Sequence, residues 1–186
     1  MISTTQITEI LSQFGELRSQ TISNWNGEIA LPKQIEDFYL EVGPVDLTID
    51  SIGNPYHIPS LSRLWKCQAG YRWNGITEEP SDDWNDDWVV VADEGADPFI
   101  FDRHNGEILF ALHGQGTWEP ERVFPDIYTM AACLGILGST AAAAGEELFD
   151  GDSLNSKYLE NIIARFKEIL GQEFKATQIL ETLGWV

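Results

Sequence analysis

Residues 88–114, WVVVADEGADPFIFDRHNGEILFALHG, constrain the fold of this chain more than any other stretch. Apolar runs at 88–92, 98–102 and 107–112 are separated by two polar turns. Val, Ile and Phe dominate the runs, as expected for half-buried or buried strands. Asn105-Gly106, between the last two runs, is typical of a two-residue hairpin turn in which both positions take positive φ. The segment therefore predicts an antiparallel ribbon at the centre of a sheet.

Helical patterns lie on both sides of this ribbon. The spacing of apolar residues predicts helices over about 5–20, 32–43, a short stretch from about Ser60, 125–144 and 153–170, with Thr177 capping a last short helix. Residues 45–49 alternate as a strand does, and GTWEPERVF is expected to form a further short strand or extended arm. This order of elements predicts an α+β fold. We expect a single domain over residues 1–186, with a mainly antiparallel sheet flanked by N- and C-terminal helices.

The charge of the chain limits its partners. Thirty acidic residues stand against 11 Lys and Arg, a net charge of -19. Nucleic-acid phosphates and anionic lipids repel such a chain, whereas basic surfaces attract it. We therefore expect a basic protein partner, with no nucleic acid and no membrane as partner; the alternative is that the charge serves solubility alone. Between Trp73 and Asp102 there is no Lys or Arg, and the acidic residues there are Glu78, Glu79, Asp82, Asp83, Asp86, Asp87, Asp93, Glu94, Asp97 and Asp102.

The sequence also indicates a compartment. No apolar run approaches the roughly 18 residues that a membrane-spanning helix needs. The first 20 residues lack the basic and apolar regions of a secretory signal. Cys67 and Cys133 lie far apart without CxxC spacing, which favours reduced thiols over a disulfide. We expect a cytoplasmic protein.

The acidic loop, residues 74–87 (NGITEEPSDDWNDD), lacks apolar periodicity and is expected to be irregular. Asp83, Asn85, Asp87 and Glu94 occupy the first, third, fifth and twelfth positions of a calcium-binding loop. Position six, which normally needs Gly, is Trp88. A chain that runs extended from there carries Glu94 about 20 Å away. No metal site is therefore expected.

The histidines are His57, His104 and His113. His104 and His113 flank opposite ends of one predicted strand, so about 30 Å of extended chain separates them. The chain also lacks a Gly-x-Ser-x-Gly elbow, a phosphate loop and a dinucleotide fingerprint. We expect no enzyme, no catalytic residue and no cofactor. The alternative is a small metal-dependent hydrolase that uses His104 or His113 with Asp97 or Asp102.

Trp84 stands alone among carboxylates in SDDWNDD. An exposed indole ring surrounded by acid would be an anchor for a basic partner. The alternative is that Trp84 folds back onto the domain. The candidate partner-binding residues are Glu78, Glu79, Asp82, Asp83, Trp84, Asp86 and Asp87.

LPKQIEDFYLEVG resembles the first motif of the SUKH superfamily, a Leu-Pro followed by a helix with inward aromatic residues and a terminal Gly. WVVVADEGADPFIFDRHNGEILFALHGQGTWEPERVFPDIYTMAACL is similar to the second half of that family. The resemblance covers about residues 28–140, with a C-terminal helical extension over about 150–186 and the acidic loop as an insertion. It implies a non-enzymatic binding domain of the kind found in Smi/Knr cell-wall-assembly regulators and in bacterial immunity proteins. Such immunity proteins often neutralise a nuclease toxin; a regulatory scaffold without a toxin partner is the other reading.

Overall fold

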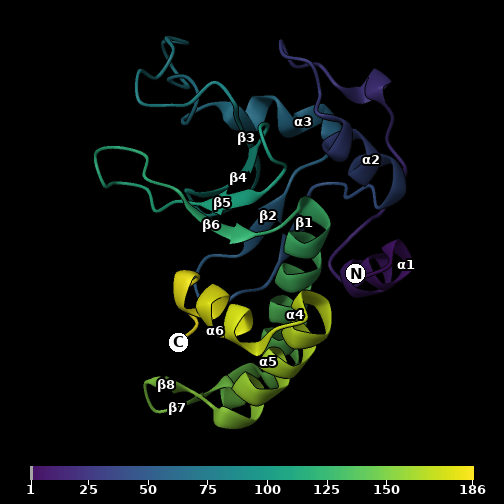
Figure 1. Cartoon of the computed structure of the whole chain (residues 1–186), viewed down its shortest axis with the longest axis vertical. Helices are drawn as coiled ribbons and strands as arrows, with labels where there is room; N and C mark the ends of the chain where they lie inside the picture. The colour runs from purple at the N-terminus through teal and green to yellow at the C-terminus, as the bar shows by residue number, and fades with distance from the viewer. Residues whose placement is uncertain (1) are drawn as a thin grey trace.

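The computed structural model describes residues 2–186, apart from the side chains of residues 173 and 174, and has the predicted α+β fold (Figure 1). The helices are α1 (Thr4–Leu11), α2 (Lys33–Glu41), α3 (Leu61–Leu64), α4 (Ile127–Ala144), α5 (Ser156–Leu170) and α6 (Glu173–Thr182), with 3-10 turns η1 (Ile22–Asn24), η2 (Lys66–Gln68) and η3 (Gly145–Leu148). The strands are β1 (Leu47–Ile49), β2 (Tyr56–Ile58), β3 (Trp88–Glu94), β4 (Asp97–Asp102), β5 (Ile108–Phe110), β6 (Glu121–Phe124), β7 (Phe149–Asp150) and β8 (Ser153–Leu154).

The main sheet is an antiparallel meander in the order β1-β2-β3-β4-β5-β6, so strands that are neighbours in the chain are neighbours in the sheet. The predicted central ribbon is β3, β4 and β5. Strand β2 pairs with β3 only at Asp93 and Glu94. The other half of β3 therefore needs hydrogen-bond partners from outside the sheet.

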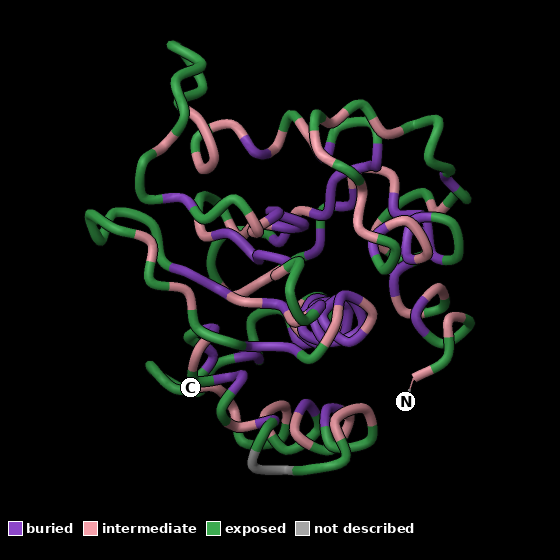
Figure 2. Tube along the Cα trace, turned by 45° about the horizontal axis from the view of Figure 1, so that its top comes forward, coloured by how far each residue is buried: buried purple, intermediate pink, exposed green. Residues whose placement is uncertain are grey.

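Helix α4 lies between the sheet and α5, as Figure 2 shows with α4 seen nearly end-on. Its side chains are buried almost all round. Gly135 and Gly138 bring its neighbours close, because a Cβ at Gly135 would lie 2.5 Å from a methyl carbon of Ile10 and one at Gly138 would lie 2.3 Å from a methyl carbon of Ile49. These glycines let α1 and β1 pack directly on the helix backbone.

One helical segment is long and apolar enough to cross a membrane, although it is not an uninterrupted apolar run. Residues Ile127–Leu148 have a mean hydropathy of 1.5 over their most apolar window. Because 72% of that window is buried inside the protein, the segment is a core helix whose apolar surface is already covered.

The C-terminal helices belong to the same core as the sheet. Ile162 and Phe166 of α5 and Leu180 of α6 are buried together with the inward residues of the strands. Trp185 donates its indole N–H to the hydroxyl oxygen of Tyr56 at 2.9 Å, which ties the end of the chain to β2.

The first and last helices differ most from the prediction. Helix α1 ends at Leu11, well before residue 20, because the following backbone forms tertiary hydrogen bonds: the N–H of Arg18 donates to Gly43 and that of Gln20 to Tyr39. Helix α6 begins at Glu173, so Thr177 lies inside it and caps nothing.

The Asn105-Gly106 turn also differs from the prediction. The reversal spans residues 103–106, with Gly106 N–H donating to Asp102 and Asp102 N–H donating to Glu107. Of the two predicted positive-φ positions only Gly106 has one, at 78°. The tight two-residue turn is at Gly95-Ala96, where Glu94 pairs with Asp97 and Gly95 supplies the positive φ of 71° that a type II′ turn needs.

Candidate functional site

The sheet has two apolar faces, and in the described part of the chain helices cover only one of them. Alternate residues of β3, β4 and β5 point to opposite sides. Val89, Phe99 and Phe101 face α4 in the main core. A smaller cluster on the other face consists of Val90, Ile100, Ala111 and Leu109 together with Tyr71, Trp84, Trp88 and Trp118. Aromatic side chains from the loops therefore take the place of a second layer of helices.

Trp84 is the centre of this cover: of the two interpretations of Trp84, the structure has the one in which the ring folds back onto the domain, and not the exposed anchor. Its side chain is 7% exposed. Its ring lies 5.4 Å from Trp88, 5.7 Å from Trp118 and 5.8 Å from Tyr71, measured between centroids. The indole folds back because the apolar second face of the sheet would otherwise be open to water.

Arg72, which the sequence reasoning missed, ties the acidic loop to β3. Its side chain is only 13% exposed. One terminal nitrogen donates to the carboxylate of Asp86 at 3.0 Å, and the other donates to the backbone carbonyls of Asp86 and Trp88. A buried guanidinium with several oxygen partners holds the backbone in one position.

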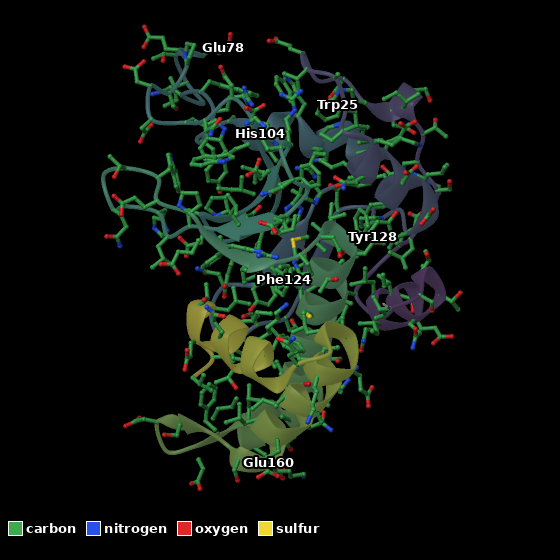
Figure 3. The ribbon with its side chains drawn as sticks, in the orientation of Figure 1. Trp25, Glu78, His104, Phe124, Tyr128 and Glu160 are labelled. Atoms are coloured by element: carbon green, nitrogen blue, oxygen red, sulfur yellow. The ribbon has the colours of Figure 1, made fainter. Side chains whose placement is uncertain are left out.

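The tip of the loop is closed by local hydrogen bonds. The side-chain oxygen of Asn74 accepts hydrogen bonds from the N–H groups of Ile76 and Thr77. The backbone N–H of Asn74 donates to the carbonyl oxygen of Glu79 at 2.8 Å. Figure 3 shows Glu78 at one extremity of the molecule, with side chains projecting outward around it. The acidic loop is thus an ordered projection, fixed at its base by Trp84 and Arg72.

The acidic candidates divide into two groups. Glu78, Glu79, Asp82 and Asp83 are exposed. Within residues 2–186 none of these four forms an ion pair. By contrast, Asp86 pairs with Arg72, although its own side chain is 96% exposed, and Asp87 pairs with His104 at 2.8 Å and Arg103 at 3.5 Å. The first four carry solvated, uncompensated charge, whereas the last two also position the loop.

A groove runs beside the base of the loop, with a volume of about 560 Å³. Rings of Trp65, Trp73 and Trp84 line it, and the first two have centroids 5.2 Å apart. Its other lining residues are Glu28, Ile29, Arg72, Glu78, Pro80, Ser81 and Asp86. Two buried donors in this lining, the Nε of Arg72 and the Nε1 of Trp84, have no hydrogen-bond partner among the described residues.

The histidines lie in separate pairs with aspartates. His113 Nδ1 lies 2.7 Å from Asp97, at the start of β4, while the backbone N–H of His104 donates to Asp102, at its end. The two ends of β4 are about 16 Å apart for an extended strand, too far for one ion. Among the side chains that the structure describes, which exclude that of Glu173, no group of three or more His, Cys, Asp or Glu could hold a metal.

Glu94, the last position of the calcium-like pattern, lies at the end of β3 opposite to Trp88. Burial raises the pKa of its carboxyl to about 7, partly offset by a hydrogen bond from the Ser51 hydroxyl at 3.1 Å. Nearby Asp97 raises the pKa further. The site around Glu94 is therefore separate from the acidic loop.

Comparisons of the chain with protein-family models, curated proteins and solved structures gave no match. The resemblance to the SUKH superfamily accordingly stays a prediction.

Proposed function

We propose that this chain is a non-enzymatic binding protein, an immunity protein of the SUKH type that neutralises a basic toxin domain such as a nuclease. The observation that carries the proposal is the set of exposed carboxylates without ion pairs on one ordered projection, Glu78, Glu79, Asp82 and Asp83. A nuclease presents basic side chains to phosphates, so such a surface can occupy the same cleft.

The anchored base of the loop supports this function. Trp84 and Arg72 hold the projection in place before any partner arrives. A pre-organised loop loses less conformational entropy on binding than a free one, so more of the interaction energy appears as affinity. The proposal includes a cytoplasmic location, in line with the free thiols of Cys67 and Cys133.

The test uses a basic toxin domain encoded beside this gene, co-expressed and then measured for binding. We expect rescue of growth and an association rate that falls steeply between low and high salt. Reversal of all four charges to Lys should slow association by about tenfold or more at low salt.

A control variant with the same change in net charge places four Lys residues at the other end of the molecule, at Glu146, Asp150, Asp152 and Glu160. These residues are exposed, and Figure 3 shows Glu160 at the end opposite to Glu78. The control should slow association much less, because screening weakens distant charges. Equal slowing by both variants would contradict a role for the loop. Binding without rescue would favour a regulatory scaffold over an immunity protein.

A further inference from the structure

The tryptophan groove, defined by the lining given above, shares Glu78 with the solvated carboxylates of the loop but otherwise differs from them chemically. Its walls are aromatic, with Trp65 also in contact with Trp25 at 5.7 Å between centroids. Trp65 and Trp73 are only half buried, so ring surface is open to a ligand. An open aromatic surface of this kind accepts apolar groups, sugars or cations.

The charges around the groove select among these ligands. Glu28 and Glu78 line it and, among the described residues, neither forms an ion pair. The cation in the lining, Arg72, is paired with Asp86. The groove therefore has uncompensated negative charge next to aromatic rings, a combination that favours a cation over a neutral or anionic group.

The protein itself places a guanidinium in this environment. The central carbon of the Arg72 guanidinium lies 5.9 Å from the centroid of the Trp65 ring, and the same group pairs with Asp86. This is the combination of ring face and carboxylate in which a planar guanidinium is more favourable than a compact, strongly hydrated ammonium.

We propose that the tryptophan groove binds an arginine side chain of the basic partner, with its guanidinium on Trp73 and its charge facing Glu28 and Glu78. The inference rests on the proposed function, because it names the chemistry by which that partner is held. The exposed acids at the loop tip attract the partner over a distance, and the groove fixes one side chain of it at close range.

The test uses the full chain and an acetylated, amidated pentapeptide with arginine between glycines. Its controls carry lysine, or citrulline, which keeps the shape of arginine without the charge. We expect saturable shifts of the Trp65 and Trp73 indole N–H signals in ¹H–¹⁵N spectra with the arginine peptide. The citrulline peptide should bind at least about fivefold more weakly, and the lysine peptide should lie between them.

Two adjacent residues supply a matched pair of variants. Glu78 lines the groove, whereas Glu79, which is also exposed, does not. Glu78→Gln should lower the affinity for the arginine peptide by about threefold. Glu79→Gln should change that affinity by less than half of this effect. Trp73→Phe should also weaken binding, because Phe attracts a cation less than Trp does.

Equal affinity for the arginine and citrulline peptides would overturn the inference, and so would equal effects of Glu78→Gln and Glu79→Gln. The proposed function has a separate test that leaves the groove intact: it fails if a variant in which Glu79, Asp82 and Asp83 alone are changed to Lys still binds the toxin domain normally. Arginine-specific binding with that result would leave the groove as an arginine site and remove the immunity function.

Discussion

The side chain of Gln68 completes the hydrogen bonding of Val90. The side-chain oxygen of Gln68 accepts the Val90 N–H at 2.8 Å, and its side-chain nitrogen donates to the Val90 carbonyl at 2.9 Å. Gln68 is fully buried and also donates to Leu64. Its amide thus replaces a neighbouring strand where β2 does not reach β3.

Gln68→Met should therefore be strongly destabilising. Methionine keeps most of the volume but leaves the N–H and carbonyl of Val90 without partners, each costing about 1–3 kcal/mol. We expect a loss of about 2–4 kcal/mol in the free energy of unfolding, measured by urea denaturation. Replacement of exposed Gln13 by Met is the control and should change it by less than about 0.5 kcal/mol. Similar changes in the free energy of unfolding for the two variants would mean that water forms the hydrogen bonds of the Val90 N–H and carbonyl in place of Gln68.

Trp84→Ala should also destabilise the fold, because it uncovers the second face of the sheet. Removal of a buried Trp side chain costs about 3–5 kcal/mol in general. Trp84→Phe should cost less, since it keeps ring contacts and removes an indole N–H that has no partner among the described residues. Urea denaturation of both variants checks the order. If Trp84→Ala left the free energy of unfolding nearly unchanged, the Trp84 ring would be exposed to solvent and not buried.

Glu94 should make stability depend on pH. Burial raises its pKa from 4.5 to about 7. Between these pH values the unfolded chain has released the proton while the folded chain keeps it, so the free energy of unfolding falls as pH rises. Glu94→Gln has no such proton. The free energy of unfolding of Glu94→Gln, relative to that of the wild type, should therefore rise by about 1–2 kcal/mol between pH 5 and pH 8. This is less than the full pKa shift implies, because the carboxylate is only partly buried.

Urea denaturation at pH 5, 6, 7 and 8 measures this gain. Glu79→Gln serves as the control, because Glu79 is exposed. Its difference from the wild type should stay nearly constant over the same range. A constant difference for Glu94→Gln as well would show that Glu94 titrates as it does in water.

Gly138→Ala tests the close approach of β1 to α4. The new methyl group would lie 2.3 Å from a methyl carbon of Ile49, so the core must shift, at a cost of about 1–3 kcal/mol. Gly75→Ala is the matched control, because its Cβ would lie 3.8 Å from the nearest atom and its φ is not positive. That substitution should be neutral or slightly stabilising. Thermal unfolding of both variants provides the measurement.

The fold could be predicted where local pattern and tertiary structure agree. Strands β3, β4 and β5 follow their apolar runs, and α4 follows Pro125 and the cap at Asp126. Helix α1 was overestimated because Phe14 and Leu17 pack on the core from irregular backbone, which mimics helical spacing. Strand β2 was missed because three residues give too little pattern.

The candidate site was only partly predictable. The exposed acidic residues could be predicted from composition. The positions of Trp84 and Arg72 could not, because they depend on contacts between segments that are distant in the sequence. One signal for Trp84 was present: Val90, Ile100 and Leu109 are apolar on the strand face opposite to the main core, so some other segment had to cover them. Nothing local marks Gln68 or the tryptophan groove, because both depend on how loops cross the sheet.

The meander order has a consequence for how the chain folds. Each strand pairs with the strand that precedes it in the chain. The sheet can therefore grow by successive closures of short loops, which favours rapid folding. The long connection is between β2 and β3, where residues 59–87 must close before Asp93 and Glu94 find their partners. We expect β3, β4 and β5 to form the folding nucleus, and the acidic loop to settle last.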